Sequence, residues 1–241
     1  MSESFAWPAL LGVLGLVFGS FIATVAIRWP AGRSALAGRS ACDGCARTLG
    51  PLELVPLVGY LALRGRCRTC GAEIAPFHPV IESIGALIGL TAGLAAPGWG
   101  GVAGAGFGWL LLALAAIDFR AFWLPDGLTA ALALAGAAFG APPLADRLIG
   151  GVAGFAALWL VAAGYRRLRG REGLGGGDAK LFGAIGLWLG WRALPGVLLV
   201  ACLIGLAVAL IRRMRASDRL PLGTLLAAGA FAAWLAGSVT I

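Results

Sequence analysis

Two aspartates stand at the edges of long apolar runs, where a carboxylate is costly unless it has a task. Asp118 ends the run LLALAAID, and Asp178 follows three glycines in REGLGGGDAKLFG. A carboxylate at the C-terminal end of a helix lies against the negative end of the helix dipole, an unfavourable place for a purely structural residue. Two carboxyl groups that share a proton can activate water and protonate a leaving group. We therefore interpret the pair as a candidate catalytic dyad.

Other acids and the single histidine allow simpler interpretations. Asp178 could cap the helix that it begins, and Asp126 in Leu-Pro-Asp-Gly is better explained as a cap than as a catalyst. Glu82 lies inside an apolar run; such a group is functional by default, although an arginine or a backbone donor could be its partner. His78 alone cannot supply a Ser-His-Asp triad or a zinc-peptidase helix. The sequence contains no phosphate-binding P-loop.

Four of the five cysteines form two C-x2-C pairs separated by 21 residues. Two such pairs can complete a tetrahedral four-sulfur site for zinc, whereas a pair of disulfides is the alternative in an oxidising compartment. Gly44 suits the tight turn of the first pair, and Arg66 and Arg68 are expected to lower the thiol pKa values. Cys202, in an apolar run, is expected to be a small packing residue. The four candidate ligands are Cys42, Cys45, Cys67 and Cys70.

The elements that must position these residues are membrane helices. The chain is 60% hydrophobic and 12% charged, and it contains no Asn or Gln, so it has too little polar surface for a soluble globule. A membrane-spanning helix needs about 20 apolar residues. We predict an all-α integral membrane protein with about eight transmembrane helices and a small zinc-binding insert between the first two. The predicted spans are 5–27, 79–96, 98–117, 127–143, 148–165, 179–191, 193–211 and 221–240.

Positive charge orients this bundle. Of the 19 basic residues 18 are Arg, and they cluster between apolar runs, which is typical of membrane topology and not of a nucleic-acid surface. The insert and the loops after spans three, five and seven, together with Lys180, hold 17 of them, against Arg147 and Arg192 on the other side. We therefore expect these loops to be cytoplasmic. Two crossings separate Asp118 from Asp178, so both return to that face.

The chain is expected to divide into three parts. Residues 1–28 form the first transmembrane helix, residues 29–78 the cytoplasmic four-cysteine insert, and residues 79–241 the membrane-embedded part that carries both aspartates. The lipid bilayer is the expected surrounding of the first and third parts, and nucleic acid is not expected as a partner.

Several motifs occur in an order that resembles the type IV prepilin peptidases. The stretch EGLGGGDAKLFGAIGLWLGW (172–191) is similar to the family signature E-G-x-G-x-G-D-x-K-L, and IDFRAFWLPD (117–126) is similar to its first-aspartate motif. The two C-x2-C pairs, GSF at 19–21, Pro79 and Glu82 also match in order. The resemblance covers nearly the whole chain.

This resemblance implies an enzyme of the bacterial inner membrane that removes the short basic leader of prepilins or type II secretion pseudopilins at the cytoplasmic face. It implies Asp118 and Asp178 as the catalytic pair, and structural zinc on the four cysteines. Many members also methylate the new N-terminus with S-adenosylmethionine, an activity linked to the insert. Gly175, Gly177 and Lys180 match the signature, and Glu82 and Asp126 match positions of unassigned role.

Two departures from the family pattern fall in the amino-terminal half. Ala23 stands where many members have Asn, and Glu53-Leu54-Val55-Pro56 replaces D-N-I-P. Glu53 could substitute for a lost polar group there. A peptidase without methyltransferase activity is therefore an alternative, and a zinc-bearing transporter or scaffold is a more remote one. A transporter should show inverted repeats, which we do not find in the sequence.

Overall fold

The computed structural model describes residues 3–42, 44–170, 173–215 and 218–239, and over these ranges the chain is helical with no regular strand. Arg171 and Glu172, which belong to the charge pattern and to the signature, lie outside the described residues. The long helices are α1 (Glu3–Arg28), α3 (Phe77–Ala95), α4 (Trp99–Ala121), α5 (Asp126–Phe139), α6 (Leu144–Arg169), α7 (Gly176–Leu189), α8 (Leu194–Ile211) and α9 (Leu222–Val239). The prediction of an all-α membrane protein is confirmed.

All eight predicted spans are helical, but they differ in reach. Within the described ranges, α1, α3, α4, α6 and the segment Trp191–Ile211 are long and apolar enough to cross a membrane. Helices α5 and α9 are apolar but shorter. Helix α7 has 14 residues, about 21 Å at 1.5 Å per residue, against a hydrocarbon core of about 30 Å. The structure thus contains five candidate spans in these ranges, together with shorter helices.

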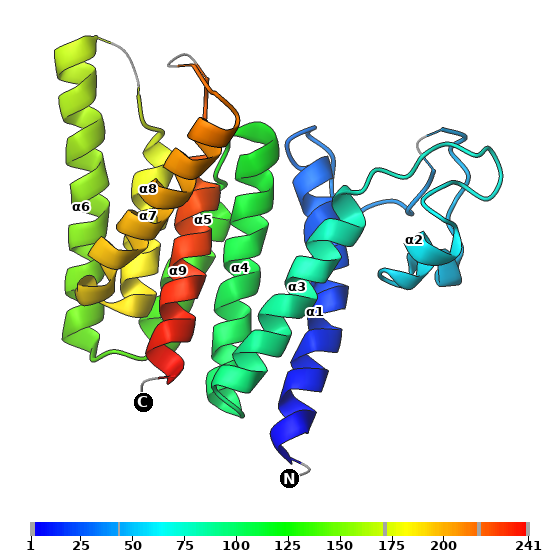
Figure 1. Cartoon of the computed structure of the whole chain (residues 1–241), viewed down its shortest axis with the longest axis horizontal. Coiled ribbons are helices and arrows are strands. Elements are labelled where there is room, and N and C mark those ends of the chain that lie inside the picture. Colours follow the sequence, from blue (N-terminus) through cyan, green and yellow to red (C-terminus); the bar gives the residue numbers. More distant parts are fainter. Residues whose placement is uncertain (1–2, 43, 171–172, 216–217, 240–241) are drawn as a thin grey trace. The chain divides into compact units, whose positions relative to one another are not determined.

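The chain divides into two compact units, Met1–Ala105 and Gly106–Ile241. In the first unit α1 packs along α3, and the two helices run side by side in Figure 1. Glycines permit this approach: a Cβ on Gly15 or Gly89 would fall on the backbone of the opposite helix. Small residues let membrane helices pack backbone to backbone in this way.

The insert of the first unit is built from two cysteine hairpins that flank the short helices η1 (Pro51–Leu54) and α2 (Val58–Ala62). Glu53 ties this segment together. Arg47 binds both of its carboxylate oxygens, at 2.7 and 3.1 Å, and the backbone N–H of Gly50 donates to one of them at 2.7 Å. These donors, Arg47 first, lower the pKa of Glu53 to about 2. Glu53 is therefore already paired within the insert.

In the second unit α7 is the central helix. It packs against α6 and α5, while α8 packs against α9 (Figure 1). Trp188 fixes its far end, because its ring stacks on Phe107 at 4.7 Å and its indole N–H donates to the carbonyl of Leu132 at 2.8 Å. The small residues Gly150 and Gly186 bring α6 and α7 together. The opposite end of α7, which carries Asp178, is thereby held in a fixed position within the unit.

Candidate active site and metal centre

Asp118 lies in the last turn of α4 and is only 5% exposed. Its Oδ2 accepts a hydrogen bond from the backbone N–H of Thr224 at 2.8 Å, and the Thr224 hydroxyl lies 3.2 Å from the same oxygen. Thr224 belongs to the first turn of α9, where free backbone N–H groups favour an anion. Gly223 allows the approach, since a Cβ there would lie 3.0 Å from Oδ2. The carboxylate at the end of one helix is therefore held by the start of another.

Asp178 lies in the first turn of α7, with Gly175 at the N-cap. A Cβ on Gly175 would lie 3.2 Å from the Oδ2 of Asp178, so the carboxylate lies beside the N-cap residue of its own helix. Asp178 is half-buried. The free backbone N–H groups of a helix start favour a carboxylate at this position.

Leu124 packs between the first turns of α7 and α9. A Cβ on Gly177 would lie 2.9 Å from the Cβ of Leu124, and a Cβ on Gly223 would lie 3.0 Å from its Cδ1. The connection from Asp118 to Leu124 passes through Phe122, whose φ of 50° is rare for a bulky residue. Strained residues of this kind cluster at functional sites.

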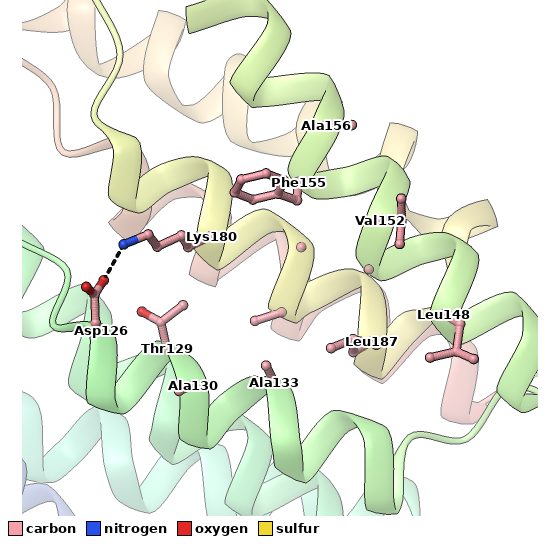
Figure 2. Close-up of a pocket in the computed structure, with 13 residues that line it drawn as sticks. Asp126, Thr129, Ala130, Ala133, Leu148, Val152, Phe155, Ala156, Lys180 and Leu187 are labelled. Carbon is pink, nitrogen blue, oxygen red and sulfur yellow. Dashed lines mark hydrogen bonds and ion pairs between the residues drawn. The ribbon is translucent and has the colours of Figure 1, made fainter.

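Asp126 does not cap α5. The N-cap residue of α5 is Pro125, and Asp126 is the first residue of the helix; its carboxylate binds the Lys180 ammonium at 2.7 Å. The cap interpretation is therefore wrong, because Asp126 lies one residue inside the helix and its carboxylate pairs with Lys180, one turn into α7. Figure 2 shows this ion pair at the end of an apolar groove of about 640 Å³ between α5, α6 and α7. Both side chains are largely exposed, at 49% for Lys180 and 75% for Asp126.

Glu82 lies in the second turn of α3 and is 5% exposed. The backbone N–H of Leu57 donates to its Oε2 at 2.8 Å. Of the partners considered for this acid, the structure shows the backbone donor. Glu82 belongs to the first unit and the two aspartates to the second.

The four insert cysteines converge on one point. Their sulfur atoms all lie within 4.8 Å of one another, and those of Cys42 and Cys70 are 3.7 Å apart. Four sulfurs held about 2.3 Å from a tetrahedral zinc ion lie about 3.8 Å apart, so the cluster fits this ion. A Cβ on Gly44 would lie 2.7 Å from the Cβ of Ala72 and 3.3 Å from the Cys70 sulfur, which explains why the turn needs glycine.

The two cysteine pairs share one backbone geometry. In the first, Cys42 N–H donates to the carbonyl of Arg47 and Ala46 N–H donates to the carbonyl of Cys42. In the second, Cys67 N–H donates to the carbonyl of Ala72, and Gly71 N–H donates to the carbonyl of Cys67, at the same spacing along the chain. Each pair is thus a tight turn that presents two sulfurs to one side.

The pKa of the Cys67 thiol falls to about 6, chiefly because the backbone N–H groups of Cys70 and Thr69 donate to it. This cause differs from the expected one, since Arg66 pairs with Glu73 at 3.5 Å. A thiolate is the form that binds metal. The expectation for Cys202 is wrong, because its side chain is exposed on α8 and does not pack inside the unit.

Two residues of the site, Thr224 and Gly223, are not marked by any sequence motif, and Leu124 occupies an unspecified position of the first-aspartate motif. Thr224 is 106 residues from Asp118, and no motif links the two. The only local signal is the Pro-Leu-Gly-Thr start of the last apolar run, which is ordinary for a helix N-terminus. Their part in the site appears only when α9 packs in the second unit.

One compact unit carries two carboxylates at helix ends, and the other carries a four-cysteine insert. Together with the five candidate membrane spans of the described residues, they define a class of multi-pass membrane protein with one candidate site in each unit. Two family descriptions match this chain: the bacterial peptidase A24 N-terminal domain over residues 13–95 and the type IV leader peptidase family over residues 105–210. The chain belongs to the type IV leader peptidase family.

Curated relatives match over most of the chain, and each is named prepilin leader peptidase/N-methyltransferase. A protein from Burkholderia pseudomallei is 39% identical over 94% of this chain and 84% of its own length. One from Klebsiella pneumoniae is 42% identical over 82% and 91%, and one from Aeromonas salmonicida is 40% identical over 82% and 70%. No solved structure matches significantly.

Proposed function

We propose that this protein removes the short basic leader from type IV prepilins or type II secretion pseudopilins and then methylates the new N-terminus. The observation that supports the peptidase half is that Gly223, which lies against the Asp118 carboxylate, and Gly177, which precedes Asp178, both pack against the side chain of Leu124. The names of the relatives, which join leader peptidase with N-methyltransferase, support both halves.

In the proposed reaction one aspartate is ionised and draws a proton from water, while the other is protonated and donates to the carbonyl or the leaving amine. Two nearby carboxylates favour this shared-proton state because like charges repel. Thr224 orients Asp118 through its backbone N–H and its hydroxyl. Gly175, the N-cap residue of α7, lies beside the carboxylate of Asp178.

The methyl-transfer half uses S-adenosylmethionine as the donor. The new amino group attacks the methyl carbon, the sulfur–carbon bond breaks with its electron pair on sulfur, and the amine loses a proton to solvent. In the insert, Cys42, Cys45, Cys67 and Cys70 would hold a structural zinc ion. The protein lies in the inner membrane with both sites at the cytoplasmic face, a placement supported by the arginine-rich loops.

Co-expression with a candidate prepilin, followed by mass measurement of the substrate N-terminus, tests both halves. Asp118→Asn and Asp178→Asn should each abolish cleavage, because an amide can act neither as base nor as acid. Asp126→Asn is the matched control and should keep substantial activity, since its ion pair is exposed. Near-normal cleavage by Asp178→Asn would falsify the dyad. A cleaved product that never gains a methyl group would leave a peptidase only.

A further inference from the structure

A polar cavity of about 520 Å³ lies within the first unit, walled by the end of α1, the start of α3 and the insert. Its volume is in the range of small-molecule sites, about 300–1,000 Å³. The walls combine arginines and carboxylates with the ring of Tyr60 and several aliphatic side chains. The groove of the second unit, by contrast, is almost wholly apolar apart from one ion pair (Figure 2). Only the first of these two spaces suits a charged ligand.

Glu82 is the most buried charged group in the wall of this cavity. Its Oε2 accepts the N–H of Leu57, and the salt bridges found between Lys or Arg and the carboxylates of the described residues do not include it. A buried carboxylate without a cation is costly. A cationic group of a ligand would stabilise this carboxylate.

The backbone around Leu57 is strained to make this contact. Leu57 has φ 59° and ψ −47°, and Val58 N–H donates to the carbonyl of Pro56 at 2.7 Å. This is a three-residue γ-turn of the rare kind with positive φ. The turn directs the Leu57 N–H to Glu82. Such strain persists at ligand sites because it orients a group that the ligand uses.

The cavity also offers positive charge away from Glu82. The exposed guanidinium groups of Arg33 and Arg39 line it and form no ion pair among the described residues. The buried Nε of Arg47, also in the wall, has no hydrogen-bond partner in that part of the chain. Carboxylates and guanidinium groups in one space complement a ligand that carries both signs of charge.

We propose that this cavity binds the methyl donor S-adenosylmethionine, and that Glu82 pairs with a positive group of the donor, the sulfonium or the α-ammonium. Arg33 and Arg39 meet the donor carboxylate, and Tyr60 with the aliphatic wall accepts the adenine ring. This assignment rests on the methyl-transfer half of the proposed function. Neither family departure removes the site: Ala23 is fully buried outside the cavity wall, and Leu54 contributes apolar surface to it.

Titration calorimetry on the purified, zinc-loaded full chain in detergent tests the site, with S-adenosylmethionine and S-adenosylhomocysteine as the two probes. Glu82→Gln should weaken binding of S-adenosylmethionine about tenfold or more, because a bond between charged groups is lost. If the affinity falls for both probes, Glu82 pairs with the α-ammonium, which both probes carry. If it falls for S-adenosylmethionine alone, Glu82 pairs with the sulfonium. Unchanged affinity for both probes overturns the proposal.

Glu73→Gln is the matched control, because Glu73 lines the same cavity but is 83% exposed and paired with Arg66. It should leave both affinities within about twofold. Ser20→Leu places a larger side chain of α1 in the cavity without changing a charged residue, and it should weaken the binding of both probes. Zinc content and thermal unfolding monitor the fold of each variant. If the wild-type chain does not bind S-adenosylmethionine, the proposal of methyl transfer itself is contradicted. If the wild-type chain binds it and neither Glu82→Gln nor Ser20→Leu weakens the binding, only the location of the site in this cavity is contradicted.

Discussion

At the scale of single residues, the site depends on how Asp118 is held. A carboxylate at the end of α4 should be destabilised by the dipole of its own helix. The first turn of α9 offsets this, because the backbone N–H of Thr224 donates to Oδ2 at 2.8 Å. The Thr224 hydroxyl lies 3.2 Å from the same oxygen and 3.0 Å from the carbonyl of Ala115, and the two acceptors share its one proton. Asp118 is therefore oriented by a residue outside both aspartate motifs.

Thr224→Val tests this orientation. It removes the hydroxyl but keeps the backbone N–H and the shape, so cleavage should fall about tenfold in kcat/KM, in line with loss of one hydrogen bond to a carboxylate. Thr224→Ser restores the hydroxyl and should recover most of the rate. The measurement is steady-state cleavage of a purified prepilin. A valine variant as fast as wild type would show that the hydroxyl does not contribute.

The same residues show where sequence reasoning ends. The two aspartates stand out because acids are rare here and lie at the edges of apolar runs. Thr224 cannot be found in this way, because a threonine at the start of a helix is explained by local structure alone. Asp126 misleads for a related reason: its local motif favours a cap, but Lys180 from another helix is the better partner.

At the scale of elements, the two cysteine turns have the same hydrogen bonds but different residues at one position. Gly71 in the second turn has φ 71°, and Ala46 at the matching place in the first has φ 56°. An L-residue in this conformation costs about 1–2 kcal/mol. The first turn therefore carries a strain that glycine removes in the second.

Exchange of these residues should change zinc retention in opposite directions. Gly71→Ala meets no atom within 4 Å, so its cost of about 1 kcal/mol is purely conformational. Ala46→Gly should hold zinc as well as the wild type or better. Competition with a chelator, starting from about one zinc per chain, gives both affinities. Equal loss of zinc in the two variants would contradict the shared geometry.

The packing of α7 on α6 sets the position of Asp178 from a distance. A Cβ on Gly186 would fall on the backbone of Gly150, so Gly186→Ala should destabilise the unit by about 1–3 kcal/mol and slow cleavage. Gly164→Ala on α6 meets no atom within 4 Å and is the matched control. Thermal unfolding and cleavage rates compare the two. A fully active, fully stable Gly186→Ala protein would contradict this packing.

At the scale of the whole molecule, hydropathy located every long helix, but not which of them reach across a bilayer. Apolar composition identifies a helix that must avoid water, whereas its length depends on caps and turns that the apolar signal does not record. Helix α7 illustrates this, since Gly175 and Gly190 bound it at 14 residues. Its neighbours α5 and α6 cover it, so it need not span alone.

Loop accessibility tests the proposed orientation. In a Cys202→Ser background with the zinc ligands intact, Arg169→Cys at the C-terminal end of α6 should react with an impermeant maleimide only once the cells are opened. Ala141→Cys, in the turn between α5 and α6, should react in intact cells. The arginine-rich last turn of α6 predicts this difference in labelling, because positively charged helix ends favour the cytoplasmic side. The reverse pattern would place the candidate site on the outer face and contradict cleavage in the cytoplasm.

The two cysteine turns are separated by 21 residues, and that stretch includes Leu57, whose N–H meets Glu82. A zinc ion on the four sulfurs would act as a cross-link that closes this loop. Closing a loop of this length removes about 3 kcal/mol of chain entropy from the unfolded state by analogy with a disulfide. Metal removal should therefore release the strained turn at Leu57, although that turn does not touch the metal. Zinc supply in the cell would then set how many copies carry an ordered cavity.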